Sequence, residues 1–389
     1  MLARRPLTLL VAPMLLLALG GSALAPGTAQ ASGGTAAVAT VTPAPLLASP
    51  AAGATEWALD KPIVVSVTGG TLTAVTLTAP DGSLVRGALT TATRWTSSGS
   101  LVPRTTYALA AVAVGPDGQQ STMSNTVRTG APDQVLRATI SPNGRTVGVG
   151  RPVVVTFNHS VRRKADVEAA LHVTTTRALG PASWSWTSDR TVQFRPRTFW
   201  PAHTGVTVTA DLRKVHAGPG LWGMHDTDAA FRIGRAFVMR VSNAKHKMTV
   251  TRDGERIRTF GVSLGKPGFP TRSGTKVIME KYVTHRMNSI TVGITGIEAY
   301  DLDVPYAMRI TSSGEFLHGA PWNPYVGIRN HSHGCTNLTL SSAKWVFNRV
   351  KEGDPVVTTG TGRSTEPWNG LGGVWNVSWT AWVAGSALS

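Results

Sequence analysis

The sequence predicts a mainly β protein in which two small β-sandwich modules precede a mixed, mostly β domain with a short helix and a tryptophan-rich tail. Short runs of β-branched residues alternate with turn signals from about residue 56 to residue 235, a spacing typical of sandwiches. The single convincing amphipathic helix spans 341–350. Because 389 residues exceed what one hydrophobic core usually fills, several domains are expected.

The first residues are typical of a targeting signal. Two arginines precede an apolar run over 7–19, and a small-x-small sequence at 29–31 offers a cleavage site. We therefore expect a signal peptide over 1–31 that exports the protein to the cell-wall space or the medium, with anchoring by an uncleaved leader as the lesser alternative. Residues 32–55 are rich in small residues and nearly uncharged, which predicts a flexible linker.

The remaining chain divides into two modules, a larger domain and a tail. The first module is predicted over 56–130 and the second over 131–235, each with β-rich runs that end in Gly or Pro turns. The larger domain is expected over 236–362. The tail, 363–389, carries Trp368, Trp375, Trp379 and Trp382. Such aromatic area is costly in water, so we expect the tail to cap a domain surface, with three of its indoles on one helical face.

The chain is strongly basic, with a formal net charge of +17 and a pI near 10.9. Its basic residues are scattered, and no nucleic-acid-binding motif is present, so we expect no nucleic-acid partner. The charge indicates a solvated basic surface, with weak attraction to anionic wall polymers as a secondary possibility.

Cys335 is the only cysteine, so no intramolecular disulfide can form. It lies in a polar stretch over 330–337, whereas an inert cysteine is usually buried among apolar residues. A thiol that attacks a carbonyl needs an imidazole to take its proton and donors to hold an oxyanion. His318, His331 and His333 are near in sequence, so catalysis is the favoured interpretation.

Two alternatives remain for this stretch. His331, His333 and Cys335 alternate, and on an extended strand they would share a face on which zinc could bind. Gly334 makes a regular strand less certain, and no nearby carboxylate or second cysteine completes four ligands. A purely structural cysteine is the other alternative. We therefore expect neither a metal nor a cofactor.

The sequence over 332–337, Ser-His-Gly-Cys-Thr-Asn, with His318 seventeen residues before the cysteine, closely resembles the active-site signature of the L,D-transpeptidases, the YkuD-type catalytic domain. Residues 316–322 resemble the family's histidine strand and the start of its lid, and Tyr300 resembles its substrate-pocket tyrosine. The tail over 370–379 resembles the C-terminal extension of the mycobacterial-type branch, in which immunoglobulin-like modules precede the catalytic domain.

The resemblance implies catalytic roles for individual residues. Cys335 would be the nucleophile, and His318 the general base that later protonates the leaving amine. In the family the backbone carbonyl after this histidine orients the ring, and Gly319 occupies that position here. The backbone N–H groups of His333, Gly334 and Cys335 would be oxyanion donors.

The resemblance also implies a set of substrate contacts. These fall on Tyr300, Trp322, Ser332, Thr336 and Asn337, with the Tyr300 hydroxyl as a further oxyanion donor. For His333 a purely structural role in the loop is nearly as well supported as direct catalysis, and for Trp322 the alternative is simple lid packing.

The activity that the resemblance implies is peptidoglycan cross-linking. The thiol would attack the third residue of a tetrapeptide stem, release the terminal D-Ala, and pass the acyl group to the amine of a neighbouring stem in a 3→3 cross-link. Carbapenems are expected inhibitors. An L,D-carboxypeptidase that hydrolyses the same bond and a non-catalytic wall-binding protein are the alternatives.

Overall fold

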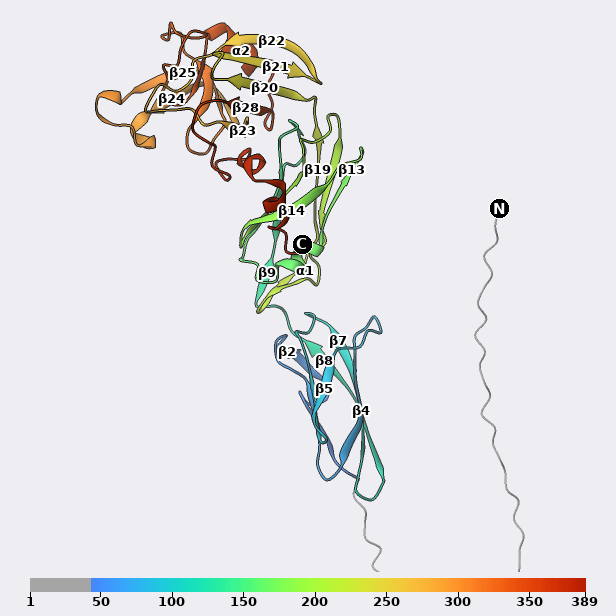
Figure 1. Cartoon of the computed structure of the whole chain (residues 1–389). Coiled ribbons are helices and arrows are strands. Elements are labelled where there is room, and N and C mark those ends of the chain that lie inside the picture. The colour runs from blue at the N-terminus through green and yellow to red at the C-terminus, as the bar shows by residue number, and fades with distance from the viewer. Residues whose placement is uncertain (1–42) are drawn as a thin grey trace, which may run out of the picture. The chain divides into compact units, whose positions relative to one another are not determined.

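The computed structural model describes residues 43–389 (Figure 1). These residues contain three large hydrophobic cores. The signal peptide predicted over 1–31 lies outside the described residues, as do residues 32–42 of the predicted linker. Within the described part of the chain, no helix is both long and apolar enough to cross a membrane.

The first core lies between two four-stranded sheets with the orders β1-β3-β6-β5 and β2-β8-β7-β4. Their strands are β1 (Leu46–Ser49), β2 (Ala54–Trp57), β3 (Val64–Val67), β4 (Thr71–Thr78), β5 (Gly87–Thr91), β6 (Arg94–Ser97), β7 (Thr106–Val114) and β8 (Gln120–Thr129). The alternating burial along β7 places every second side chain in this core, as the sequence pattern predicts.

The prediction of a linker as far as residue 55 was too long. Strand β1 pairs in antiparallel register with β3, and Ala44 is already buried in the first core. Leu46 and Ala48 pack against that core from β1. Small residues in a strand give a weak sequence signal because their composition resembles that of a linker.

The second core lies mainly between the sheets β10-β12-β15-β14 and β11-β19-β16-β13, with a small sheet β17-β18-β9 beside them. The elements are β9 (Gln134–Leu136), β10 (Ala138–Ser141), β11 (Thr146–Val147), β12 (Val153–Phe157), α1 (Lys164–Ala169), β13 (Leu171–Thr175), β14 (Ala182–Ser188), β15 (Thr191–Pro196), β16 (Gly205–Ala210), β17 (His216–Gly218), β18 (Leu221–Gly223) and β19 (Thr227–Ile233). The two predicted sandwiches are therefore confirmed.

The third core belongs to the mixed domain, which contains the sheets β22-β21-β20-β28-β23 and β24-β25-β26-β27. Its elements are β20 (Phe237–Ser242), β21 (Lys247–Arg252), β22 (Glu255–Gly261), β23 (Gly274–Val277), β24 (Glu280–Asn288), η1 (Ser289–Val292), η2 (Gly296–Glu298), β25 (Asp301–Arg309), β26 (Phe316–Gly319), β27 (Thr336–Leu338), α2 (Leu340–Phe347) and β28 (Pro355–Thr359).

Helix α2 follows directly after β27 and covers the third core. The Thr339 side chain caps the helix by accepting a hydrogen bond from the Ser342 amide, and Ala343 and Val346 are buried. The helix ends at Phe347, three residues before the predicted end. It contacts β25, β26 and β27, so it supports the strands on which the predicted catalytic residues lie.

The tail forms two short helices, η3 (Gly373–Asn376) and α3 (Trp379–Val383), and not the single helix that the tryptophan spacing predicts. The chain is extended at Val377, and the Ser378 side chain then caps a new helix by accepting from the Ala381 amide. The expected shared helical face is therefore wrong.

The three tryptophans nevertheless converge on one side chain of the second sandwich. The guanidinium of Arg195 lies 4.9 Å, 5.4 Å and 4.6 Å from the ring centroids of Trp375, Trp379 and Trp382. Trp382 is fully buried, and its indole N–H donates to the Ser183 carbonyl.

The same tail also binds the mixed domain through β23. The Asn376 side chain accepts from the Thr275 amide at 2.8 Å and donates to the Thr275 carbonyl, which joins η3 to β23. The tail thus caps the second sandwich as well as the mixed domain, whereas the sequence predicted a cap over one domain surface.

Candidate active site

Strands β26 and β27 bring His318 and Cys335 together. The two strands pair in parallel, and their register places His318 beside Asn337. Cys335 immediately precedes β27, so its side chain emerges at the start of this pair. The sixteen residues between the end of β26 and the start of β27, 320–335, form the crossover between these neighbouring strands.

The ring of His318 is held at both nitrogens. Its Nδ1 lies 2.8 Å from the Gly319 carbonyl, the contact that the family resemblance led us to expect, and its Nε2 lies 2.9 Å from Asn337 Nδ2. A carbonyl can only accept, so Nδ1 carries the hydrogen and Nε2 keeps a lone pair. Burial lowers the pKa of His318 to about 4, so the imidazole is neutral near pH 7.

Asn337 is in turn fixed by a residue that the sequence did not indicate. Asn323 Nδ2 donates to Asn337 Oδ1 at 2.9 Å, which orients the amide and directs its N–H group toward His318. Asn323 also accepts from the Tyr325 amide through its own Oδ1. The crossover segment therefore orients the histidine through one intermediate side chain.

The thiol of Cys335 is only 9% exposed and faces backbone groups of the turn before β26. Its Sγ lies 3.9 Å from the Gly314 carbonyl oxygen, and the Phe316 amide donates a hydrogen bond to the sulfur. Burial raises the pKa of the thiol to about 12. The resting site thus holds a protonated thiol and a neutral imidazole.

The loop before Cys335 is organised by hydrogen bonds from hydroxyl groups. Ser332 Oγ donates to the Cys335 carbonyl at 2.6 Å and accepts from the Gly334 amide at 3.1 Å. Gly334 has φ +124°, a conformation that favours glycine. Thr271 Oγ1 donates to the Gly334 carbonyl at 2.7 Å, so a distant residue without any local sequence signal supports the loop.

Three donors are available near the thiol for an oxyanion. Within residues 43–389 the amides of His333 and Cys335 donate no hydrogen bond, whereas the Gly334 amide is already bound to Ser332. Burial raises the pKa of Tyr300 to about 12, so its hydroxyl keeps its proton and can donate. Gly334 therefore shapes the loop, and its own amide is not free in the resting site.

The side chain of His333 has a partner of its own. Its Nε2 lies 2.6 Å from Glu298 Oε2, and Lys266 Nζ lies 2.6 Å from the same oxygen. These hydrogen bonds lower the pKa of Glu298, which stays ionised. The sequence analysis did not identify Glu298, because its partners are 32 and 35 residues away in the chain.

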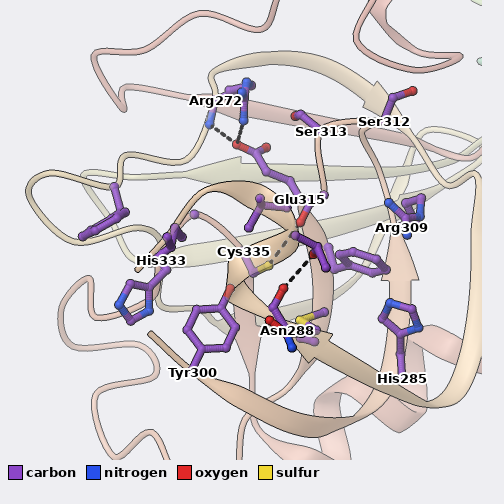
Figure 2. Close-up of a pocket in the computed structure, with 18 of the residues that line it drawn as sticks. Arg272, His285, Asn288, Tyr300, Arg309, Ser312, Ser313, Glu315, His333 and Cys335 are labelled. Atoms are coloured by element: carbon purple, nitrogen blue, oxygen red, sulfur yellow. Dashed lines mark hydrogen bonds and ion pairs between the residues drawn. The ribbon is translucent and has the colours of Figure 1, made fainter. Parts of the chain in front are cut away.

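Two cavities meet at Cys335. They have volumes of about 640 Å³ and about 200 Å³ and share the lining residues Met287, Tyr300, His333 and Cys335. Figure 2 draws the larger cavity and shows Tyr300 and His333 on one side of the thiol, with His285 and Arg309 on the other. Substrate groups can therefore approach the sulfur from two directions.

The smaller cavity contains most of the remaining predicted site residues. His318, Trp322, Ser332 and Asn337 line it, and the exposed Trp322 ring lies 6.2 Å from the His318 ring. Thr336 differs from the prediction, because it is fully buried in β27 and lines neither cavity. A side chain inside the sheet supports the fold and has no path to substrate.

The geometry of a shared metal-binding face is not formed. His331 packs edge-on against Tyr325 at 5.0 Å, while His333 is turned to Glu298. The φ of Gly334 interrupts the strand-like alternation on which the zinc alternative depended. Within residues 43–389, no three His, Cys, Asp or Glu side chains come close enough together to hold a metal ion.

Comparisons with known families agree with this geometry. The L,D-transpeptidase catalytic domain matches residues 236–358, and the bacterial Ig domain matches residues 54–216, which include the first sandwich and much of the second. A solved LD transpeptidase in complex with imipenem superimposes with a TM-score of 0.51 and 36% sequence identity. The matched region covers 59% of this chain and 100% of the solved chain.

Two relatives from Mycobacterium tuberculosis match most of the chain. L,D-transpeptidase 2 is 33% identical over 350 residues, which cover 88% of this chain and 85% of the relative. L,D-transpeptidase 5 is 34% identical over 357 residues, which cover 89% of this chain and 78% of the relative. This chain belongs to the L,D-transpeptidase family.

Proposed function

We propose that the protein forms 3→3 cross-links in peptidoglycan through an acyl-enzyme on Cys335. The observation that carries this proposal is that the thiol and His318 line the same cavity, and that the thiol lies at the point where two cavities meet. One cavity can hold the donor stem while the other admits the acceptor amine, so both partners reach the same sulfur.

Acylation starts from the neutral pair of thiol and imidazole. The thiol turns from the Gly314 carbonyl toward His318, the Asn337 N–H group moves off Nε2, and the freed Nε2 lone pair takes the thiol proton. The thiolate attacks the carbonyl carbon of the third stem residue and forms a C–S bond. The His333 and Cys335 amides, with the Tyr300 hydroxyl, stabilise the oxyanion.

Collapse of this intermediate breaks the C–N bond to the terminal D-Ala. The amine of D-Ala leaves with the proton that His318 carries, which restores the neutral imidazole. The amine of a second stem then gives a proton to His318 and attacks the thioester. The C–S bond breaks, the thiolate recovers the proton, and one amide has replaced another without ATP.

Hydrolysis of the same thioester is the second candidate, because water can also reach the sulfur through an open cavity. In that case the product is a tripeptide stem, and the protein is an L,D-carboxypeptidase. The ratio of amine to water at Cys335 decides between the two outcomes.

We further propose that carbapenems acylate Cys335, since a family member has been solved in complex with imipenem. The acyl group would form on the same sulfur and use the same donors. The signal-like leader supports export, and the basic surface supports weak attraction to anionic wall polymers.

The decisive experiment incubates the purified exported form with tetrapeptide muropeptides and separates the products by mass spectrometry. Dimers linked 3→3, with release of D-Ala, are expected. Tripeptide monomers alone would replace the proposal with L,D-carboxypeptidase activity. Unchanged substrate, together with binding to purified wall and no labelling by a carbapenem, would replace it with a non-catalytic wall-binding function.

A further inference from the structure

Arg272, Lys276 and Glu315 form a cluster of buried charges beside the nucleophile, here called the buried cluster. Glu315 Oε1 accepts from Arg272 Nη1 at 3.0 Å, and Glu315 Oε2 lies 3.2 Å from Lys276 Nζ. Lys276 is fully buried, and Glu315 is 4% exposed. Charges are rarely buried to this extent, and ion pairs in such places often cost as much as they contribute. Simple stabilisation is therefore a weak explanation for the cluster.

The backbone on either side of Glu315 contacts the thiol. The Gly314 carbonyl faces Cys335 Sγ at 3.9 Å, and the Phe316 amide donates to the same sulfur. The Glu315 amide is itself held by Thr311 Oγ1 at 2.8 Å. Fixing the Glu315 side chain therefore fixes both backbone groups on which the resting sulfur lies.

A second connection runs from the buried cluster to the catalytic loop. Lys276 Nζ donates to the Arg272 carbonyl, and Arg272 directly follows Thr271, whose hydroxyl holds the Gly334 carbonyl. Figure 2 shows Glu315 joined to Arg272 above Cys335. The cluster thus connects the turn at Gly314, which contacts the thiol, with the segment at Thr271, which supports the loop before Cys335.

The charges of the cluster act on the thiol in opposite directions. Among charged side chains, Glu315 raises the pKa of Cys335, whereas Lys276 and Arg309 lower it, and burial exceeds all three. Arg309 extends from β25 and pairs with Glu280 at 2.8 Å. Other titratable groups that line the cavities at the thiol are Arg272, His285, Arg286, Tyr300, His318, His331, His333 and Arg363.

We propose that the buried cluster is a positioning device for the nucleophile, which holds the backbone of residues 314–316 against the Cys335 thiol and presents opposed charges to it. Glu315 and Lys276 are positioning residues in this device. They act on the sulfur through the backbone of residues 314–316 and through the electric field of their charges. This inference rests on the proposed role of Cys335 as the nucleophile.

The test is alkylation of the full exported protein by iodoacetamide. The Cys335 thiolate displaces iodide, a C–S bond forms, and the thiol proton passes to solvent. Because the chain has one cysteine, the second-order rate reports this site alone. At pH 8, far below the thiol pKa, the rate follows the thiolate fraction, so one unit of pKa changes it roughly threefold after the opposing change in nucleophilicity.

The device predicts changes of opposite sign. Glu315→Gln leaves the positive charges unopposed and should raise the alkylation rate about threefold, whereas Lys276→Met should lower it by a similar factor. Lys276→Arg should restore the wild-type rate, and the double variant Glu315→Gln with Lys276→Met should lie between the single variants. A purely structural cluster would change both single variants in the same direction, in step with their melting temperatures.

A matched control breaks another buried ion pair of the same domain. Asp354→Asn removes the carboxylate that lies 3.0 Å from Arg235, and neither group acts on the thiol. This variant should melt earlier without a change in alkylation rate. An unchanged rate in Glu315→Gln, or parallel changes in the two single variants, would overturn the inference. If Glu315→Gln does not fold, Lys276→Met and Lys276→Arg test the inference: the first should lower the alkylation rate and the second should keep the wild-type rate.

The alkylation assay is independent of the proposed reaction. Opposite shifts in alkylation with no product from muropeptides would leave the positioning device in place and reject the transpeptidase proposal. Cross-linked products with parallel shifts in alkylation would do the reverse.

Discussion

The buried cluster and a second cluster, formed by Lys266, Glu298 and His333 and here called the open cluster, both use a carboxylate to join segments near Cys335. Glu315 is almost inaccessible to water, whereas the Glu298 side chain is 35% exposed. In the open cluster, the Glu298 carboxylate binds the His333 ring, which lines both cavities. In the buried cluster, the Glu315 carboxylate binds Arg272 next to the turn that contacts the thiol. Solvent screening should weaken the open cluster, and the buried cluster should act at nearly full strength.

The nucleophile lines the larger cavity together with residues of both clusters, and its removal has the largest expected effect. Cys335→Ala should abolish cross-linking and covalent trapping by carbapenems, because the chain contains no other thiol. Intact-protein mass spectrometry measures the trapped adduct, and circular dichroism checks that the variant is folded. An adduct on the folded variant would contradict the assignment of the nucleophile and remove the basis of the comparison.

Loss of the base should have the next largest effect. His318→Ala should slow acylation by roughly 10²-fold or more, the usual scale for losing acid–base assistance. His331→Ala, which removes a histidine of the same loop region, should have only a small effect. Stopped-flow measurement of carbapenem acylation compares the two, and a chelator should leave the wild-type rate unchanged. Loss of activity on chelation, with one zinc per chain, would restore the metal alternative.

The neutral state of His318 should also appear in stability against pH. Its folded-state pKa of about 4 lies below the ordinary value of 6.5, so the unfolded chain binds more protons between these values. The contribution of neutral His318 to the free energy of unfolding is fully present above pH 6.5. It is lost as the pH falls toward 4, which lowers the free energy of unfolding by roughly 3 kcal/mol. Urea unfolding of wild type and His318→Gln at pH 7 and pH 4.5 measures it. An equal loss in both proteins would show that His318 is not the cause.

Truncation after Thr361 tests whether the buried cluster depends on the tail. It removes Glu366, which accepts from Arg272 at 2.6 Å, together with the buried Trp382. We expect the melting temperature to fall by roughly 6 °C or more, since loss of one buried tryptophan costs about 3 kcal/mol, and acylation to slow several-fold.

Arg195→Met serves as the control for this truncation, because it removes the guanidinium between the three indoles and leaves Glu366 in place. It should lower the melting temperature with little change in acylation. If the truncated protein melts and reacts normally but binds purified wall less tightly, the tail is a binding surface and not a cap.

The smallest effect is expected in the open cluster. Glu298→Gln should slow acylation by no more than about threefold, and 0.5 M salt should reduce even this difference, because the carboxylate is partly exposed to solvent. The alkylation differences of the buried-cluster variants should persist in the same salt. Equal salt sensitivity of both clusters would remove the distinction between them.

The sequence predicted the parts of this molecule whose signals are local. The alternation in the strands indicated the sandwiches, and the motif around Cys335, with His318 upstream, indicated where the site would lie. Glu315 and Lys276 gave no such signal, since 39 residues separate them and only the packing of β23 against the turn before β26 brings them together.

Two further differences have equally specific causes. Thr336 matches the family motif, but the two-residue period of β27 turns its side chain into the protein interior, where its hydroxyl has no hydrogen-bond partner among residues 43–389. The tryptophan spacing of the tail fits one helix, but Ser378 starts a second one, and the convergence on Arg195 arises from tertiary packing.

The packing of three tail indoles around Arg195 affects how cooperatively the protein unfolds. The second sandwich and the mixed domain each have a large hydrophobic core, and these cores adjoin through Val238 and Val357. The last residues of the chain are hydrogen-bonded or packed to both domains as well. When either core unfolds, the tail loses its contacts and the same tryptophans become exposed to water. Unfolding of one core therefore also removes contacts that stabilise the other. These two cores should therefore unfold in a single calorimetric transition, and a nick in the tail should broaden that transition, because the ion pairs of Arg145 and Arg151 with Glu352 still join the two domains.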